Sequence, residues 1–409
     1  DSMQHHTQVT ILQELMRQLD AGQNIDAGVQ YRMPTKDYVC TDRAQQEQQH
    51  FFRDHPHVVG LSNDLPENGC FYTVDELGIP ILTTRDQTGR FRAFLNACRH
   101  RSARVVSETR GKKSVLMCPF HHWSYSVSGE LINVPNQDHF GDIDKACMGL
   151  VELPAEERNG MLWVHPNPAA SLNLDELLGD LNAEFATHPA GDLIFAGETT
   201  IQKRLNWKLA NDTFGETYHF GKLHKDTLGQ LYYGNNLHLT LFDQHHRFVT
   251  ANHGIDAMRE EPIAQWHIAR GTFVLYYLFP NVQFLINPES ATLIRIYPVP
   301  GNPSESVTKI SFYYSQAAID AGAAEITKDD EASVYDRRND RGGSLQANLE
   351  VFKSTIEDED YVMGEMQQKA AESGLLDHII FGRNEPALHH FHSSFKAALG
   401  EPPLERILS

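Results

Sequence analysis

Hydrophobic and polar residues alternate with two different periods along the chain. Near the N-terminus, apolar residues recur at helical spacing, namely Ile11, Leu12, Leu15, Met16 and Leu19. This stripe predicts an amphipathic helix that ends around Gly22. From about residue 39 to 166, short runs of β-branched and aromatic residues are separated by Gly, Asp and Asn. These runs lie at 71–74, 80–84, 91–95 and 161–164, and they predict a small all-β domain.

The segment 167–409 mixes helical and strand patterns. Helices are predicted around 205–220 and near 343–373, and strand candidates lie at 237–250, 272–279, 282–287 and 307–314. Strands between flanking helices predict an α+β domain with a largely antiparallel sheet. We therefore expect three parts: an N-terminal helix and arm, 1–38, that packs on the α+β domain; an all-β domain, 39–166; and the α+β domain, 167–409.

The composition excludes several classes of protein. The 409 residues carry a formal charge of −19, which opposes binding to nucleic acid. The longest aromatic and aliphatic run, 273–279, stops at Pro280, so we expect no membrane span. The first residues show no basic segment followed by an apolar one, and we expect a cytoplasmic protein. Five dispersed cysteines indicate reduced thiols or metal ligands. No dinucleotide or P-loop motif is present, so NADH chemistry, if needed, would fall to another protein.

The all-β region contains two segments that each offer one thiolate and one imidazole. Cys98 and His100 form the first pair, and Cys118 and His121 form the second. Two cysteines and two histidines can hold tetrahedral zinc, or a [2Fe–2S] cluster with two thiolates on one iron and two imidazoles on the other. The spacing alone leaves both alternatives open.

A second constellation lies in the α+β region. His219 and His224 are five residues apart, so on a regular helix they would diverge, but Gly221 offers a break. A two-histidine, one-carboxylate set with open positions suits non-haem Fe(II) and O₂ chemistry. The helical stripe Leu345, Leu349, Phe352, Ile356, Met363 and Met366 predicts which acid faces the core. Of the run 357–360, only Glu359 and Asp360 fall close to that stripe.

Both constellations resemble one family. The pattern C-x-H…C-P-F-H, followed by Trp123 and Tyr125, resembles the Rieske cluster motif, although Ser102 and His122 stand where the motif usually has glycine. A signature E-D-x-x-x-x-E-x-x-Q aligns on Glu359, Asp360, Glu365 and Gln368. Over residues 40–395 the chain therefore resembles the large (alpha) subunit of Rieske-type ring-hydroxylating oxygenases.

The resemblance implies site residues and cofactors. Cys98, His100, Cys118 and His121 would bind a Rieske [2Fe–2S] cluster, and His219, His224 and Asp360 would bind a mononuclear Fe(II), with Asp358 as the alternative third ligand. Glu216 would link His219 to His121 of an adjacent subunit. Asp212 stands where many relatives have Asn near the iron, and it is a candidate without a defined role.

The resemblance also implies the fold and the partners. We expect an α+β protein with an N-terminal all-β Rieske domain and a catalytic domain of the helix-grip (START-like) type. A ferredoxin or an NAD(P)H-dependent reductase would supply electrons, and O₂ and a small organic molecule would be the substrates. The assembly would be a homotrimer, with or without a small beta subunit.

The sequence leaves the substrate open. An aromatic or related ring, as in aromatic hydrocarbon catabolism, is the main expectation, and N- or O-demethylation of a quaternary ammonium or methoxy compound is the alternative. Candidate pocket residues are Tyr232, Tyr233, Phe242, Phe248, Trp266, Tyr276, Tyr277 and Phe279, and candidate carboxylate partners are Arg247, Arg270 and Arg295. A Rieske electron carrier without a working iron site and a zinc-stapled binding module are the alternatives from other classes.

Overall fold

The structure, a computed structural model, describes residues 3–321 and 345–408, with the backbone alone for 345–348. The chain forms two compact units. One, here called the β unit, comprises 47–174 and 190–192, and the other, the α+β unit, comprises 1–46, 175–189 and 193–409. The boundaries thus lie at 46/47 and 174/175, where the sequence predicted 38/39 and 166/167.

Short antiparallel strands make up the β unit. They form a five-stranded sheet of order β10-β5-β4-β3-β6 and two three-stranded sheets of orders β11-β12-β2 and β7-β8-β9. The strands are β2 (His57–Leu61), β3 (Cys70–Val74), β4 (Ile81–Arg85), β5 (Phe91–Leu95), β6 (Arg110–Lys112), β7 (Val115–Met117), β8 (Ser124–Ser126), β9 (Leu131–Asn133), β10 (Glu152–Leu153), β11 (Ala155–Arg158) and β12 (Met161–Val164). The four predicted runs correspond to β3, β4, β5 and β12. Phe71, Leu82, Phe94, Trp123 and Tyr125 belong to one buried core, which also contains Cys98 and Cys118.

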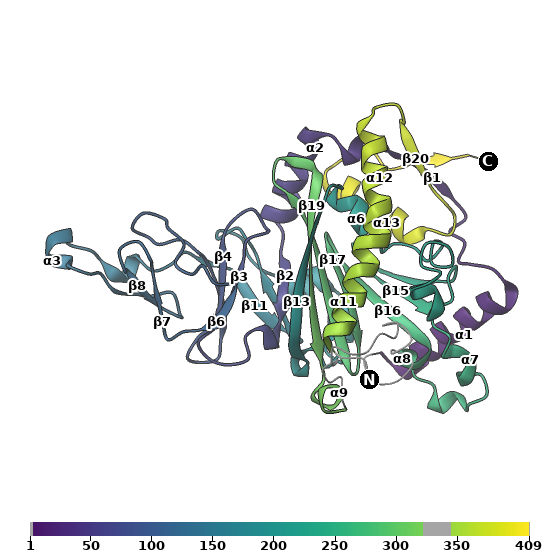
Figure 1. Cartoon of the computed structure of the whole chain (residues 1–409), viewed down its shortest axis with the longest axis horizontal. Coiled ribbons are helices and arrows are strands. Elements are labelled where there is room, and N and C mark those ends of the chain that lie inside the picture. Colours follow the sequence, from purple (N-terminus) through teal and green to yellow (C-terminus); the bar gives the residue numbers. More distant parts are fainter. Residues whose placement is uncertain (1–2, 322–344, 409) are drawn as a thin grey trace, which may run out of the picture. The chain divides into compact units, whose positions relative to one another are not determined.

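A seven-stranded antiparallel sheet forms the centre of the α+β unit (Figure 1). Its order is β13-β19-β18-β17-β16-β15-β14. The strands are β13 (Ile194–Lys203), β14 (His238–Phe242), β15 (His245–Ala251), β16 (Thr272–Leu278), β17 (Val282–Asn287), β18 (Ser290–Val299) and β19 (Asn302–Tyr314). The predicted antiparallel sheet is confirmed, but the sequence patterns did not identify β13 and β18.

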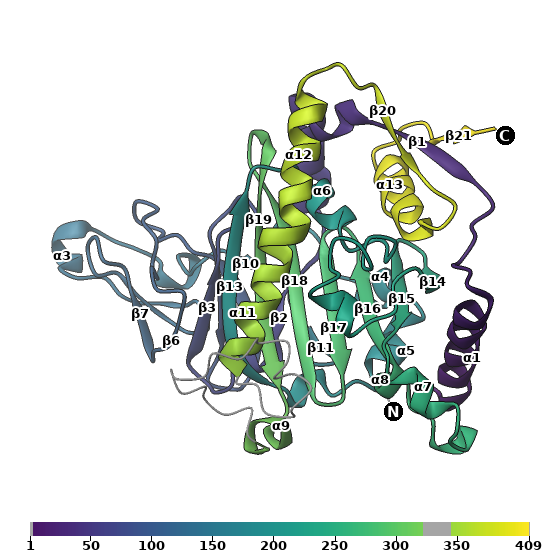
Figure 2. The same ribbon diagram turned by 45° about the vertical axis from the view of Figure 1, so that its right-hand side comes forward.

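One long helical segment crosses this sheet. It consists of α11 (Leu345–Thr355), a π-helical turn at Ile356–Asp360 and α12 (Tyr361–Glu372) (Figure 2). A short helix, α6 (Trp207–Asp212), contacts α12 as well as β18 and β19. The helix α13 (Pro386–Ala398) packs its Phe391 ring edge-on against Tyr277 of β16, with 4.5 Å between the ring centroids. The metal-site candidates lie in the turns that follow α6 and in the π-helical turn.

Two predictions for these helices are wrong. The helix expected over 205–220 ends at Asp212, and turns occupy 213–227. Met363 and Met366, predicted to face the core, are 40% and 60% exposed, and the buried face of α12 consists of Tyr361, Gly364, Gln368 and Ala371. A π turn contains one residue more than an α turn. The extra residue shifts the buried positions of α12 by one residue relative to the predicted stripe.

The N-terminal segment belongs to the α+β unit. The predicted helix is α1 (His5–Ala21), and it ends at Gly22, whose φ of 60° is left-handed. Its buried Gln18 amide donates to the carbonyl of Leu237 at 2.8 Å and accepts the N–H of the same residue at 2.9 Å. β1 (Gln30–Pro34) lies between β20 (His378–Phe381) and β21 (Glu405–Ile407). In the described part of the chain, no helix combines the length and apolarity that a membrane span requires.

The other α-helices within the described residues are short. They are α2 (Thr41–Glu47), α3 (Gln137–Phe140), α4 (Leu174–Leu178), α5 (Leu181–Phe185), α7 (Ile255–Met258), α8 (Ile268–Gly271) and α9 (Gln316–Asp320).

Candidate metal centres

The four predicted cluster ligands lie in the β unit as a pair of cysteines and a pair of histidines. The Cys98 and Cys118 side chains are buried in the core. The Nδ1 atoms of His100 and His121 lie 3.2 Å apart, and His121 is exposed. Two buried thiols and two imidazoles whose Nδ1 atoms face each other form a donor set that fits a [2Fe–2S] cluster with mixed ligation.

The two ligand loops have the same backbone design. In each loop the cysteine carbonyl accepts the N–H four residues later at 2.9 Å, from Ser102 and from His122. The cysteine N–H in turn donates to the carbonyl five residues later at 2.8 Å, that of Ala103 or Trp123. Tyr125 adds a contact, since its hydroxyl lies 3.3 Å from Cys98 Sγ and accepts the N–H of Arg99 at 2.9 Å. Sequence and backbone thus hold the two loops in matched conformations.

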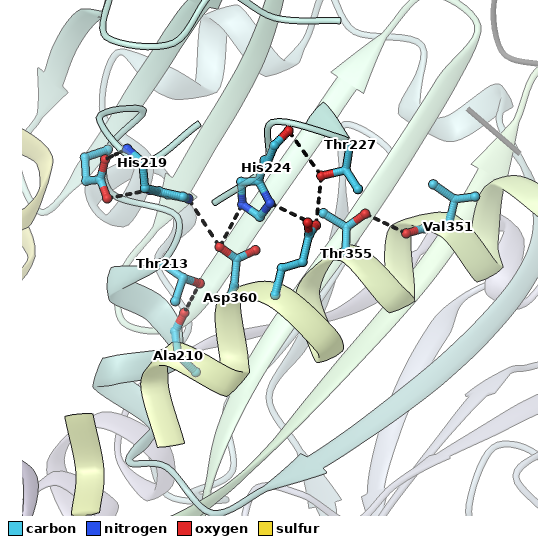
Figure 3. Close-up of polar contacts among 10 residues, drawn as sticks. Ala210, Thr213, His219, His224, Thr227, Val351, Thr355 and Asp360 are labelled. Atoms are coloured by element: carbon cyan, nitrogen blue, oxygen red, sulfur yellow. Dashed lines mark hydrogen bonds and ion pairs between the residues drawn. The ribbon is translucent and has the colours of Figure 1, made fainter. Parts of the chain in front are cut away.

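In the α+β unit, the structure brings His219, His224 and Asp360 together, and a ligand atom from each lies within 4.8 Å of the other two. Asp360 Oδ1 lies 3.2 Å from His219 Nε2 and 2.9 Å from His224 Nε2 (Figure 3). The turns that follow α6 supply both histidines, and the π-helical turn supplies the carboxylate. Two imidazoles and one carboxylate form a donor set that suits Fe(II).

Charge pairing dominates the electrostatics of this group. Burial by itself would lower the pKa of His219, but the hydrogen bonds that its ring donates to the Asp360 and Glu216 carboxylates raise this pKa to about 10. Burial would raise the pKa of Asp360, but hydrogen bonds from the two imidazoles hold this pKa below its ordinary value. A carboxylate that is only 8% exposed therefore needs positive charge beside it, which a divalent ion can also supply.

Each of these histidines has a glutamate behind it. Glu216 Oε1 lies 2.5 Å from His219 Nδ1, as the sequence predicted for this pair, and Glu216 Oε2 accepts the His219 N–H at 3.1 Å. Glu359 Oε2 lies 3.0 Å from His224 Nδ1 and accepts the Thr227 hydroxyl at 2.8 Å. Carboxylates on the second ring nitrogen fix the tautomer and the orientation of a metal-binding histidine. The helical stripe in the sequence placed Glu359 near the core but indicated no role for it.

Two other acidic candidates lie outside the group. Asp358, the alternative ligand, is exposed. Asp212 accepts the Tyr38 hydroxyl at 2.7 Å and lies 2.7 Å from His392 Nε2, so it joins α6 to the N-terminal arm and to α13. These contacts give Asp212 a structural role that spacing could not reveal.

An apolar cavity adjoins the triad and has about 600 Å³ of empty space, part of it open to solvent. Five phenylalanines line it, namely Phe214, Phe220, Phe248, Phe273 and Phe352. Among the described residues, no Lys or Arg lines this cavity. A second cavity shares Thr213, Glu216, His219 and Asp360 with the first and also contains Asp212 and Glu385. The metal-site candidates therefore form a wall between an apolar cavity and a more acidic one.

Most of the predicted pocket residues lie elsewhere. Of the eight aromatic candidates, Phe248 lines the apolar cavity. Arg247 pairs with Glu184, Arg270 with Glu261 at 2.6 Å and Arg295 with Glu198 at 3.4 Å, all away from that cavity. Alternate strand residues point to opposite faces, and the composition of a strand does not say which face borders the cavity. The three candidate partners for a carboxylate substrate therefore do not line this cavity.

Comparison with known families decides between the alternatives. Residues 190–401 match the ring-hydroxylating alpha subunit (catalytic domain) family, and residues 55–152 match the Rieske [2Fe-2S] domain. The chain belongs to the family of ring-hydroxylating alpha subunits. These two domains carry a Rieske [2Fe–2S] cluster and a mononuclear non-haem iron, so both predicted cofactors are confirmed. The zinc-stapled module is excluded.

The relatives include proteins with different substrates. The glycine betaine monooxygenase oxygenase subunit of Chromohalobacter salexigens is 32% identical over 168 residues, which are 41% of this chain and 37% of that protein. The carnitine monooxygenase oxygenase subunit of Escherichia coli K12 is 23% identical over 373 residues, 89% of this chain and 92% of that protein. This chain spans little more than a third of the first two curated relatives, at 37% and 36% of their lengths.

Solved structures agree on the fold. The quaternary ammonium Rieske monooxygenase CntA in complex with L-carnitine has a TM-score of 0.73 at 20% identity, covering 91% of this chain and 96% of that one. Naphthalene 1,2-dioxygenase with bound indole has a TM-score of 0.66 at 19% identity, covering 93% and 94%. The predicted fold class, an all-β Rieske domain with an α+β catalytic domain, is confirmed.

Proposed function

We propose that this chain is the terminal oxygenase component of a multicomponent Rieske oxygenase. Cys98, His100, Cys118 and His121 would hold the cluster, and His219, His224 and Asp360 would hold Fe(II). When bound, the two metal groups supply electron storage and O₂ activation. The convergence of His219, His224 and Asp360 on the wall of an apolar cavity carries this proposal, because it puts a substrate beside the place where O₂ would react.

The residues of this chain bind the substrate, orient the metal-binding histidines and keep water away from the site. The phenylalanines around the apolar cavity hold a ring beside the triad and keep bulk water from it. Glu216 and Glu359 fix the tautomers of His219 and His224, so that both Nε2 atoms face Asp360. A ferredoxin or an NAD(P)H-dependent reductase supplies the electrons, since the sequence lacks a dinucleotide motif.

Head-to-tail association of copies into a trimer is supported by two complementary surfaces. The acidic cavity contains Glu216 and is rimmed by Met363 and Ile380, which are 40% and 56% exposed. In the β unit, the exposed Phe120 ring stacks on His121 and the exposed Phe140 ring lies edge-on to His100. Further exposed apolar side chains of this unit are Val115, Met117 and Ile132. The acidic cavity with its apolar edge is complementary to the apolar surface of the β unit that presents the His121 imidazole. Glu216 would then meet His121 of the adjacent subunit.

The substrate we favour is an uncharged aromatic or related apolar ring. Carnitine, glycine betaine and anthranilate each carry a carboxylate, which a binding site usually meets with Arg or Lys. The described lining of the apolar cavity provides neither, and its aromatic rings suit an apolar guest. Demethylation of a quaternary ammonium compound remains the second candidate, because phenylalanine faces also attract cations.

A substrate panel tests the function. The reconstituted protein, with a surrogate reductase and NADH, is given indole, choline or carnitine, and substrate-dependent O₂ uptake and products are measured. We expect indole to give an oxygenated product and carnitine to give none. Formaldehyde from choline would support the second candidate. A protein that is reduced and reoxidised without oxygenating any ring or amine in a broad panel would be an electron carrier.

The role of Glu216 has its own test. The variant Glu216→Gln keeps a hydrogen bond to His219 but removes the charge. We expect unchanged metal content and a single-turnover reoxidation rate at least about tenfold lower, because the link between the two centres is weakened. Glu260→Gln, an exposed acid outside both cavities, is the control. A normal rate in Glu216→Gln would contradict the predicted electron route.

A further inference from the structure

Glu359 and Asp360 are consecutive residues that contact opposite edges of the same imidazole. Asp360 Oδ1 lies 2.9 Å from His224 Nε2, and Glu359 Oε2 lies 3.0 Å from His224 Nδ1. In a regular α-helix, neighbouring side chains diverge by about 100°. Both residues belong to the π-helical turn, whose wider winding brings the two side chains closer together. The turn therefore clamps one ring from both sides.

The surroundings of Glu359 separate it from Glu216. Glu216 lines both the apolar and the acidic cavity, whereas Glu359 lines neither. Glu359 is held instead by the Thr227 hydroxyl, on the same turn segment that carries His224. His224 itself is 1% exposed at its side chain, while the His219 side chain is 19% exposed. Both histidines line the apolar cavity, but His219 alone of the two also lines the acidic cavity.

We propose that Glu359 is a positioning residue that fixes the ring of His224 through Nδ1 and thereby determines how firmly the site retains its metal ion. Glu359 keeps the proton on Nδ1, so the Nε2 lone pair faces the ion. Because Glu359 touches neither cavity, its contribution is independent of substrate and of any partner that docks near Glu216. His224 is the fixed ligand of the pair, and His219 is the ligand that a partner can influence.

The inference extends the proposed function but is tested without turnover. The holoprotein is challenged anaerobically with a ferrous chelator, and the loss of the mononuclear iron is followed. We expect Glu359→Ala to lose this iron about 10- to 100-fold faster than the wild type. Glu359→Gln, which still accepts a hydrogen bond, should restore part of the difference. The cluster absorbance of the same samples reports whether the variants fold.

Asp358→Asn is the matched control, because it neutralises the exposed neighbour in the same turn. Thr227→Val removes only the hydroxyl that holds Glu359 and should give a smaller acceleration of the same sign. A nitric oxide adduct of the ferrous site should show altered EPR rhombicity in the Glu359 variants alone. Wild-type retention in Glu359→Ala would overturn the inference. Normal iron binding in a wild-type protein that oxygenates nothing would overturn the proposed function and leave this inference intact.

Discussion

Ser102 and His122 occupy equivalent positions, four residues after Cys98 and Cys118, and both have a left-handed backbone, with φ of 66° and 62°. Each donates its N–H to the carbonyl of its cysteine. The family motif usually has glycine at both places, and the structure retains the conformation that glycine favours. Local strain is therefore built into both cluster loops.

Replacing either residue with glycine should stabilise the β unit. Relief of the left-handed strain is worth about 1–2 kcal/mol, and the added freedom of the unfolded chain offsets about half of it. We expect Ser102→Gly and His122→Gly each to gain about 0.5–1 kcal/mol, measured as a higher temperature for loss of the cluster absorbance. Ser107→Gly, where φ is not left-handed, should instead lower that temperature.

Removing the charge of Asp360 should empty the mononuclear site and spare the cluster. Asp360→Asn leaves two histidines and a neutral amide, which is a poor donor for Fe(II). Metal and sulfide analysis should fall from about three irons per chain to about two, with about two sulfides retained. Asp358→Asn should keep about three irons. The reverse outcome would make Asp358 the ligand.

The stability of the α+β unit should fall as the solution is acidified below pH 6.5. Burial lowers the pKa of His245 to about 4, and its neutral ring accepts the Phe279 N–H at 2.9 Å while donating to the Leu177 carbonyl at 2.8 Å. The unfolded chain binds a proton near pH 6.5, so the contribution of His245 is complete above that pH and is lost toward pH 4.

From these two pKa values, His245 accounts for about 2 kcal/mol of lost stability at pH 5. Urea unfolding at pH 7.5 and pH 5, followed by tryptophan fluorescence, measures the loss. His245→Gln should be less stable than the wild type at pH 7.5 and show a smaller drop between the two pH values. His253→Gln, at an exposed position, should show the wild-type drop. Equal drops in all three proteins would count against this explanation.

Shortening Phe352 should change substrate binding without changing metal content. Phe352 lines the apolar cavity from α11 and packs edge-on against Phe312, with 5.7 Å between the ring centroids. Phe352→Ala removes about 1–2 kcal/mol of ring contact from a bound substrate, which corresponds to a KM about tenfold higher for a single-ring compound. Met366→Ala, on the exposed side of α12, is the control. An unchanged KM would place the substrate elsewhere.

The convergence of His219, His224 and Asp360 could be predicted from the sequence because the candidate donor set depends on residue type and order. The predicted helical stripe correctly placed Asp360 near the core, although the same stripe wrongly predicted that Met363 and Met366 are buried. The reason is the π turn, which lies at the acidic run itself, so positions before it keep the predicted phase and Met363 and Met366 do not. No rule of amino-acid composition predicts a π turn. Without knowledge of this turn, the contact between Glu359 and His224 could not be predicted.

The failure to predict β13 and β18 from the sequence also has physical causes. β13 is mostly half-buried and includes Gly197 and Glu198, so it has no clear alternation of apolar and polar residues. β18 carries Arg295, which is 1% exposed and is paired with Glu198 across the sheet. A buried arginine resembles a surface residue until its partner is known. The residues that line the apolar cavity could not be predicted from the sequence either, because the lining depends on which face of the sheet contacts α11.

The wall that separates the two cavities has a practical consequence for protein engineering. Thr213, Glu216, His219 and Asp360 contact both sides, while the five phenylalanines belong to one side and Asp212 and Glu385 to the other. Libraries that vary the phenylalanines can therefore alter substrate scope without altering the face that we propose to meet the adjacent subunit. The two properties can be optimised in separate rounds and then combined, provided that the four wall residues are left unchanged.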